Sequence, residues 1–311
     1  MRIHHYEIES LLGKGATGEV YQALDLHLDR RVALKFLYGT DNFQTVPLFL
    51  REARIAAALT HPGIVTIHSI EAYRDRPFLV MEQIDGVPLH HLIDRHHEYS
   101  AEHLLDVVRQ CCAALEYAHA NNVIHRDIKP ANVLIQRDGR VRICDFGLAK
   151  SLAEPTLTST HTVKGTPLYM SPEQLRGDLL TSASDQYAVA VLAMQVLSGL
   201  LPFESDTLIQ LANKILHDAP SIQALPAGVQ PVFARAFSKD PRARFATCGA
   251  FFEALSTAVL RTRDAQVAAI TRQHRAASLR RTWKSLATAF VFGVISYVAV
   301  WITFLSVAPN P

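Results

Sequence analysis

The segment His125–Asn132, followed thirteen residues after its end by Asp145-Phe146-Gly147, constrains this chain more than any other feature of its sequence. Asp127 can accept a proton from a hydroxyl group, and Lys129 can neutralise charge on a migrating phosphoryl group. Asn132 and Asp145 offer hard oxygen ligands, which suit Mg²⁺. Each short motif is common by chance, but their order and spacing together indicate a site for phosphoryl transfer.

A glycine-rich octapeptide lies between two predicted strands near the N-terminus, Gly13-Lys14-Gly15-Ala16-Thr17-Gly18-Glu19-Val20. Glycines allow the backbone to bend over a phosphate chain and bring its N–H groups within hydrogen-bonding reach. A dinucleotide-binding loop would lead into a helix, whereas this one leads into the predicted strand Val20–Leu24. Taken alone, the pattern also fits a simple glycine turn.

Lys35 ends the apolar strand Val32-Ala33-Leu34-Lys35. A lysine in this position is usually a surface charge, but beneath a phosphate-binding loop it can hold the α- and β-phosphates if an acid orients it. Glu52, on the next predicted helix, is the expected acid. The alternative for Glu52 is an ordinary solvated helix residue.

The surrounding sequence predicts an α+β fold in which a small β-rich part precedes a larger helical part. Strands are expected at Tyr6–Leu12, Val20–Leu24, Arg31–Leu37, Ile64–Ile70 and Phe78–Met81. Helices are expected at Phe49–Leu59, from Ala101 onward, and at Ser184–Leu197, Leu208–Leu216 and Phe251–Leu260. The chain has no internal repeat and no Pro/Gly/Ser-rich linker, so we expect a single globular domain.

With these motifs in place, the sequence resembles the eukaryotic-like (Hanks-type) Ser/Thr protein kinases, especially the bacterial PknB-like kinases. The stretch Gly165–Gln174, GTPLYMSPEQ, carries the bacterial character. The resemblance covers about Tyr6 to Leu260. It implies a bilobal protein kinase fold, with an N-lobe of about residues 6–84 and a C-lobe of about residues 85–260. It further implies transfer of the ATP γ-phosphate to Ser or Thr hydroxyls of proteins, with Mg²⁺ or Mn²⁺ as cofactor.

The resemblance also assigns roles to further residues. Leu12, Val20, Ala33 and Leu134 are expected to enclose the adenine, with Met81 as gatekeeper and the Glu82 carbonyl and Ile84 amide at the adenine edge. Asp185 is expected to brace the catalytic loop, and Glu173 to pair with Arg244. Lys129 and Thr166 stand where the Ser/Thr branch has them. Ser171-Pro172-Glu173 replaces the Ala-Pro-Glu of many members, and no catalytic position is degraded.

Regulation by phosphorylation is expected from Arg126, which we interpret as an unpaired cation in the inactive state. A phosphate on the segment Ser151–Thr162 could pair with it and order that segment. The candidate acceptors are Thr156, Thr158, Ser159, Thr160 and Thr162, among which Thr158 and Thr160 have the spacing before Gly165-Thr166 that PknB-like kinases use. The alternative is an unmodified polar loop.

The clustered histidines and the cysteines are not expected to form a metal site, a disulfide or a catalytic group. The five histidines 90, 91, 96, 97 and 103 lack the spacing of a metal motif and are read as a solvated surface. The four cysteines form no C-x-x-C pair, which favours a reducing compartment. Cys144 is read as a small spacer beside the nucleotide site. A net charge of +2 argues against nucleic acid as a partner.

Residues 286–307 form a run of 22 residues without a charge. At about 1.5 Å per residue, a helix of this length crosses a hydrocarbon core of roughly 30 Å. The run follows a basic segment, residues 261–285, and precedes a short tail, residues 308–311. The basic side is expected in the cytoplasm, which predicts a single-pass protein of the inner or plasma membrane with its kinase domain cytoplasmic. A buried core helix is the alternative.

The sequence favours an active, membrane-tethered kinase over two other functional classes, a membrane scaffold and a small-molecule kinase. A membrane scaffold that binds nucleotide without catalysis is disfavoured by the intact catalytic residues. A small-molecule kinase is disfavoured by the activation segment and by Gly165–Glu173, which are expected to form a peptide-docking surface. The resemblance also suggests homodimers formed through the small lobe.

Overall fold

The computed structural model describes residues 1–15, 18–38, 45–74, 76–146 and 166–262. The chain divides into two compact units, Met1–Ala258 and Val259–Pro311, of which the second is described only up to residue 262. The predicted membrane segment 286–307, the tail 308–311 and most of the basic segment 261–285 lie outside the described residues. Within the described residues, no helix combines the length and apolar character needed to span a bilayer.

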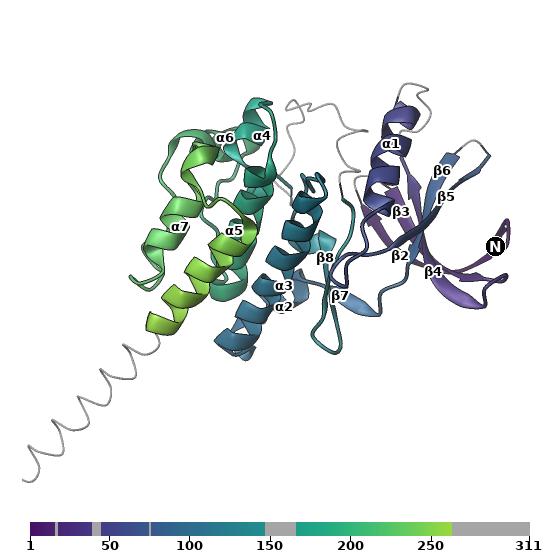
Figure 1. Cartoon of the computed structure of the whole chain (residues 1–311), viewed down its shortest axis with the longest axis horizontal. Helices are drawn as coiled ribbons and strands as arrows, with labels where there is room; N and C mark the ends of the chain where they lie inside the picture. The colour runs from purple at the N-terminus through teal and green to yellow at the C-terminus, as the bar shows by residue number, and fades with distance from the viewer. Residues whose placement is uncertain (16–17, 39–44, 75, 147–165, 263–311) are drawn as a thin grey trace, which may run out of the picture. The chain divides into compact units, whose positions relative to one another are not determined.

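The N-lobe is built on a six-stranded sheet in which neighbouring strands are antiparallel, in the order β1-β2-β3-β4-β6-β5 (Figure 1). The strands are β1 (Arg2–Ile3), β2 (Tyr6–Gly15), β3 (Gly18–Asp25), β4 (Arg30–Leu37), β5 (Ile67–Tyr73) and β6 (Arg76–Glu82). Asp25 accepts hydrogen bonds from the amides of His27 and Leu28, which closes the turn between β3 and β4. Helix α1 (Thr45–Ala57) packs against β5.

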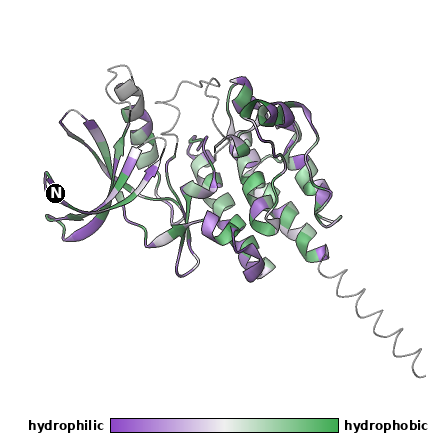
Figure 2. Cartoon of the chain, turned by 180° about the vertical axis from the view of Figure 1, so that it is seen from behind, coloured by the Kyte–Doolittle hydropathy of each residue, from purple (hydrophilic) through white to green (hydrophobic). Residues whose placement is uncertain are grey.

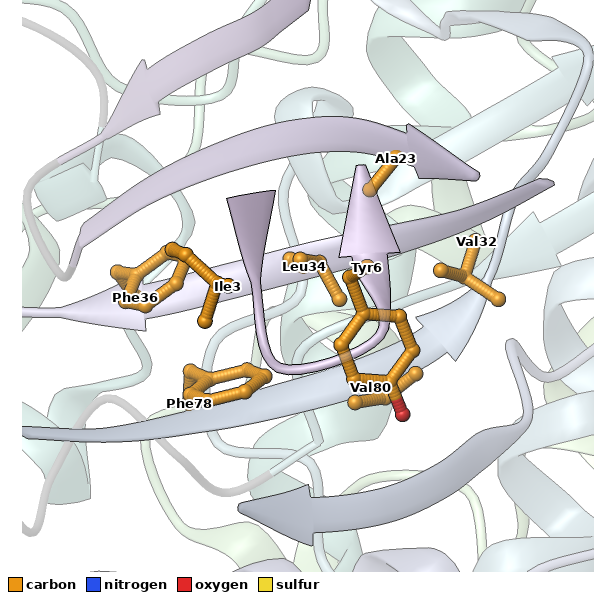
Figure 3. Packing of buried hydrophobic residues seen from close by; sticks show 8 residues of the cluster. All are labelled: Ile3, Tyr6, Ala23, Val32, Leu34, Phe36, Phe78 and Val80. Carbon is orange, nitrogen blue, oxygen red and sulfur yellow. The ribbon is translucent and has the colours of Figure 1, made fainter. Parts of the chain in front are cut away.

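The pleat of β4 divides its side chains between two faces of this sheet, because successive residues of a strand point to opposite sides. Val32, Leu34 and Phe36 join a cluster with Ile3, Tyr6, Ala23, Phe78 and Val80 (Figure 3). Ala33 and Leu37 face the other way and pack with Ala53 of α1. Lys35 shares the parity of Ala33 and Leu37, so the strand directs it to the α1 side of the sheet.

The C-lobe is mainly helical and is built around α5 (Ser182–Ser198), whose residues 184–194 are all buried. A helix that is buried all round has to be apolar all round, which explains its run of Ala, Val, Leu and Met. α5 packs on α3 (Ala101–Ala120) and α7 (Gln230–Ala236). Figure 2 shows hydrophobic residues along these helices. The other α-helices of the described residues in this lobe are α2 (His90–Ile93), α4 (Pro172–Arg176), α6 (Leu208–His217) and a helix over residues 248–262.

A second sheet has three strands in the order β7 (Gly86–Pro88), β8 (Val133–Gln136) and β9 (Val141–Ile143). Strand β8 begins directly after the catalytic loop. The predicted strand Ile64–Ile70 is displaced, because Ile64 forms an isolated parallel bridge with Ile143 of β9 and β5 begins only at Ile67. The other predicted strands and helices are confirmed to within a few residues at each end.

Candidate active site

The glycine-rich segment forms the hairpin of β2 and β3, in which Gly15 pairs with Gly18. A Cβ atom on Gly18 would lie 2.0 Å from the carbonyl oxygen of Phe36 on β4, so only glycine fits there. On Gly13 a Cβ atom would meet nothing within 4 Å. The close approach of three strands therefore requires Gly18, whereas the space at Gly13 is open. The predicted loop residues Ala16 and Thr17 lie outside the described residues.

The carboxylate of Glu19 binds three side chains near this hairpin. Lys14, its cross-strand partner, places Nζ 2.8 Å from Glu19 Oε1. The hydroxyls of Tyr21 and Tyr38 donate to the same carboxylate at 2.7 and 3.1 Å. The Lys14 ammonium and these two hydroxyls lower the pKa of Glu19 to about 2. Sequence reasoning placed Lys14 and Glu19 in the loop but did not anticipate the two tyrosines, which come from β3 and from the residue after β4.

Lys35 is 3% exposed, and its Nζ lies 2.6 Å from Oδ1 of Asp145. Burial alone would raise the pKa of Asp145, but the charge and hydrogen bond of Lys35 outweigh it and hold the pKa below its ordinary value. Asp145 has a φ of +67°, a left-handed conformation that is uncommon for a non-glycine residue. The ionised carboxylate is thus held ready at the end of β9.

The catalytic loop gathers three predicted residues at one point. Lys129 Nζ lies 2.7 Å from Oδ2 of Asp127. The side-chain Nδ2 of Asn132 donates to Oδ2 and to the backbone carbonyl of Asp127, at 3.0 and 2.8 Å. The amide oxygen of Asn132 is then the atom suited to bind a metal. The structure therefore brings the candidate base, its neighbouring cation and one candidate metal ligand together.

His125 connects this loop to β9. Its Nδ1 accepts the amide of Asp127 at 3.2 Å, so the ring proton of a neutral imidazole is on Nε2, which donates to the carbonyl of Cys144 at 2.9 Å. The Cys144 amide in turn donates to the carbonyl of Asn132 at 3.0 Å. The ring also contacts Phe146, with centroids 4.4 Å apart. These bonds place Asp145 beside the catalytic loop.

Asp185 of α5 braces the loop as expected. Its carboxylate accepts the amides of His125 at 2.7 Å and Arg126 at 2.8 Å. His119, at the end of α3, adds a contact of 2.8 Å from Nε2. The sequence did not indicate His119, because 66 residues separate it from Asp185 and only the packing of α3 on α5 brings the two together.

Two predicted pairings differ in the structure. Glu52 contacts Nη1 of Arg126 at 2.8 Å, while Lys35 contacts Asp145. The expectation that Arg126 is an unpaired cation is therefore wrong. The ion pairs of the described residues do not include Lys35 with Glu52. The physical reason is the position of α1, which places Glu52 within hydrogen-bonding distance of the catalytic loop.

Two of the four residues predicted to enclose the adenine, Val20 and Ala33, lie in one apolar cluster. Ala33 and Met81 are buried, and Val20, Ile84 and Cys144 pack against them. Leu12 is 51% exposed and lies outside that cluster, as does Leu134 on β8. The Glu82 side chain pairs with Arg142, whose guanidinium also donates to the Pro62 carbonyl at 2.8 Å. This link between β6 and β9 was not predicted, since a residue three before Asp145 carries no signal of its partner.

The expected pair of Glu173 with Arg244 is present and buried, each residue being 2% exposed. Two parallel hydrogen bonds of 2.8 Å join the guanidinium to the carboxylate. Ser184 donates a third bond to Glu173, and Arg244 lies over the ring of Tyr187 at 4.9 Å. Arg244 also donates to the carbonyl of Ala183, so the pair links α4 and α5 to the segment that precedes the helix over residues 248–262.

Metal binding at this site would involve few protein ligands. In the part of the chain that the structure describes, no group of three or more His, Cys, Asp or Glu side chains could hold a metal ion. Asn132 and Asp145 are oxygen donors of the kind that bind Mg²⁺ together with phosphates and waters. The donor set therefore fits a metal that arrives with a nucleotide. Thr158 and Thr160, the predicted phosphorylation sites, lie outside the described residues.

Comparisons with known proteins agree on the family. The sequence profile described as "Protein kinase domain" matches residues 6–255. The chain is 37% identical over 250 residues to the Serine/threonine-protein kinase PrkC of Bacillus subtilis, covering 78% of this chain and 38% of that protein. It is 36% identical over 262 residues to PknA of Mycobacterium tuberculosis, covering 81% of this chain and 60% of that protein. The chain thus spans between about two fifths and three fifths of the length of these curated relatives.

Solved structures show the same fold. The PknI kinase domain of Mycobacterium tuberculosis superimposes with a TM-score of 0.64 at 25% identity, covering 83% of this chain and 97% of that one. Rad53 superimposes with a TM-score of 0.67 at 24% identity, covering 81% of this chain and 65% of that one. Both likenesses include the sheet-rich N-lobe and the helical C-lobe.

Proposed function

Because the chain belongs to the protein kinase family, we propose that it transfers the γ-phosphate of ATP to Ser and Thr hydroxyl groups of proteins. The observation that carries the proposal is the contact of Asp127 with both Lys129 and Asn132 at 3.0 Å or less. A carboxylate in this position can receive a hydroxyl proton while the adjacent ammonium balances charge on the phosphoryl group. The names of the relatives PrkC and PknA as Ser/Thr kinases support the choice of acceptor.

The roles of the chain's own residues follow from their positions. Asp127 orients the acceptor hydroxyl and takes its proton, and Lys129 accompanies the phosphoryl group. Lys35 holds the α- and β-phosphates beneath the hairpin of β2 and β3. Asn132 and Asp145 are the residues that would hold Mg²⁺, which supplies charge neutralisation at the phosphates.

We further propose that phosphorylation of Thr158 or Thr160 by the kinase itself raises its activity. Arg126 is bound to Glu52 at 2.8 Å in this structure. A phosphate group carries more charge than a carboxylate and offers more acceptor oxygens, so it competes well for a guanidinium. Once Arg126 turns to the phosphate, Glu52 is available to orient Lys35, and Asp145 is left to the metal.

The chain is also proposed to be held at a membrane by residues 286–307, with the kinase domain in the cytoplasm. The support is the absence of charge over 22 residues and the excess of Arg and Lys that precedes them. Homodimers formed through the small lobe, which the resemblance to PknB-like kinases suggests, are proposed to take part in this autoactivation.

The test of the activity uses the full chain purified in mild detergent. It is incubated with ATP, Mg²⁺ and dephosphorylated casein beside an Asp127→Asn variant, and phosphosites are mapped by mass spectrometry. We expect phosphate on casein Ser or Thr and on Thr158 or Thr160 with the wild type, and about 10²-fold to 10⁴-fold less with the variant. Nucleotide binding without any phosphate transfer by the wild type would instead favour the membrane scaffold.

A further inference from the structure

The side-chain amide of Gln174 connects Ser171, at the start of α4, with the backbone of Arg126 in the catalytic loop. Its Nε2 donates to the backbone carbonyl of Arg126 at 2.7 Å. Its Oε1 accepts the amide and the hydroxyl of Ser171 at 3.0 and 3.2 Å. One side chain on α4, directly after the predicted peptide-docking segment Gly165–Glu173, is thereby bonded to the catalytic loop 48 residues earlier in the chain.

Arg126 needs such support because its backbone is unusual. Its φ is +69°, a left-handed conformation that a non-glycine residue retains only where its surroundings hold it. Three elements do so: Asp185 of α5 accepts its amide, Glu52 of α1 binds its side chain, and Gln174 of α4 binds its carbonyl. The hydrogen bond from Gln174 holds the Arg126 carbonyl, and it comes from α4, next to the predicted peptide-docking segment.

The carbonyl of Arg126 shares a rigid peptide plane with the amide of Asp127. That amide donates to Nδ1 of His125 at 3.2 Å. The hydrogen bond from Gln174 to the Arg126 carbonyl therefore also fixes the direction of the Asp127 amide. Because this amide is attached to the Cα atom of Asp127, the position from which the Asp127 side chain projects is fixed as well. Gln174 acts on the candidate base through the backbone and does not touch the reacting atoms.

The chemistry of the two bonds requires a carboxamide. The Arg126 carbonyl can only accept a hydrogen bond, while the Ser171 amide can only donate one, so the joining group has to be donor and acceptor at once. A glutamate in place of Gln174 would keep the acceptor for Ser171 and lose the donor for Arg126. Lysine would do the reverse, and leucine would lose both.

We propose that Gln174 is a positioning residue for Asp127. Through it, α4, which begins at the end of the predicted peptide-docking segment Gly165–Glu173, is coupled to the catalytic loop. The proposal rests on the proposed protein kinase function for its kinetic consequence. Its structural consequence, restraint of the backbone between His125 and Asp127, does not depend on activity.

The test substitutes Gln174→Glu in the full chain in detergent, because this change retains the cap on Ser171 and removes only the donor. We expect kcat for casein phosphorylation to fall about 10-fold to 100-fold, since an unmade hydrogen bond beside a carbonyl and a facing carboxylate both disfavour the native loop. The KM for ATP should stay within about twofold, because Gln174 lies away from the nucleotide residues.

Gln110→Glu is the matched control. Gln110 of α3 likewise donates from Nε2 to a backbone carbonyl, that of Gly139 at 3.0 Å, and accepts the Val141 amide at 2.9 Å, but at the turn between β8 and β9. It should leave kcat within about twofold, whatever it costs in thermal stability. A kcat for Gln174→Glu within twofold of the wild type, or an equal fall with Gln110→Glu, would overturn the proposal.

Amide hydrogen exchange separates this inference from the proposed function. In the unphosphorylated, nucleotide-free protein, Gln174→Glu should speed exchange at the amides of His125–Asp127 about tenfold, and Gln110→Glu should not. Faster exchange together with a wild type that transfers no phosphate would sustain the positioning role and refute the kinase activity. Unchanged exchange would refute the positioning role, even in an active enzyme.

Discussion

The guanidinium of Arg126 donates from Nη1 to Oε1 of Glu52 at 2.8 Å, across 74 residues of sequence. Each of these residues was expected to serve a different partner, Arg126 a phosphate and Glu52 the ammonium of Lys35. Arg126 therefore has to leave this contact before its guanidinium can bind a phosphate. Under the proposed function, a phosphate that draws Arg126 away from Glu52 would act on Lys35 through this ion pair.

This link predicts that Arg126 carries the response to phosphorylation. Phosphatase treatment should lower kcat/KM of the wild type about tenfold or more, because a charge-assisted hydrogen bond contributes about 1.5–3 kcal/mol. In Arg126→Gln, treated and untreated protein should differ by less than about twofold. Arg140→Gln, which alters an exposed arginine paired with Asp138, should respond as the wild type does. Equal inactivation of Arg126→Gln and wild type by phosphatase would contradict the link.

The glycine hairpin predicts different costs for two similar substitutions. Gly18→Ala places a methyl group 2.0 Å from the Phe36 carbonyl and should lower stability by about 1–3 kcal/mol, since the strands have to separate. Gly13→Ala meets open space and should change stability by less than about 1 kcal/mol. Thermal unfolding without nucleotide measures both, and indistinguishable midpoints would show that the strands are not held this closely.

The buried Glu173–Arg244 pair predicts a large loss on removal of one partner. Glu173→Gln should destabilise the C-lobe by about 3–5 kcal/mol at pH 7, because Arg244 is left buried without its counter-ion. For a domain of this size, the unfolding midpoint should fall by about 10 °C or somewhat more. Asp178→Asn, in the exposed pair of Asp178 with Arg176, should cost less than about 1 kcal/mol.

The same pair predicts the direction of the pH dependence. Burial would raise the pKa of Glu173, but the hydrogen bonds and charge of Arg244 lower it below its ordinary value. Its contribution is complete above the ordinary pKa of glutamate, about 4.3, and is lost as pH falls through the lower, folded-state pKa. The stability difference between wild type and Glu173→Gln should therefore shrink in acid. A difference in unfolding free energy that is unchanged between pH 7 and pH 3, followed by circular dichroism, would argue against an ionised pair.

The uncharged segment 286–307 predicts where the protein is found in cells. The full chain should sediment with membranes and resist a carbonate wash, because a helix of this length is stable only with its apolar surface in lipid. A chain that stops after Arg281 should appear in the soluble fraction. If the shortened protein still sediments with membranes after the wash, another part of the chain must hold it there.

Much of the site could be predicted because its members are close in sequence. Asp127, Lys129 and Asn132 lie within six residues, so one loop conformation brings them together. Alternating apolar residues on β4 likewise predict which face Lys35 occupies, since strand geometry imposes the parity. The Glu173–Arg244 pair was predicted from the resemblance and not from the residues themselves.

The order and spacing of the residues are therefore enough to indicate the reactive groups and the local elements that present them. Tertiary structure alone decided the partners across long separations: Glu52 with Arg126, His119 with Asp185, and Gln174 with the Arg126 carbonyl. The physical reason is that a hydrogen bond or ion pair forms only within about 3 Å, so its partner depends on how whole helices pack. Helix α1 places Glu52 beside Arg126, and no pattern within the helix itself encodes that position.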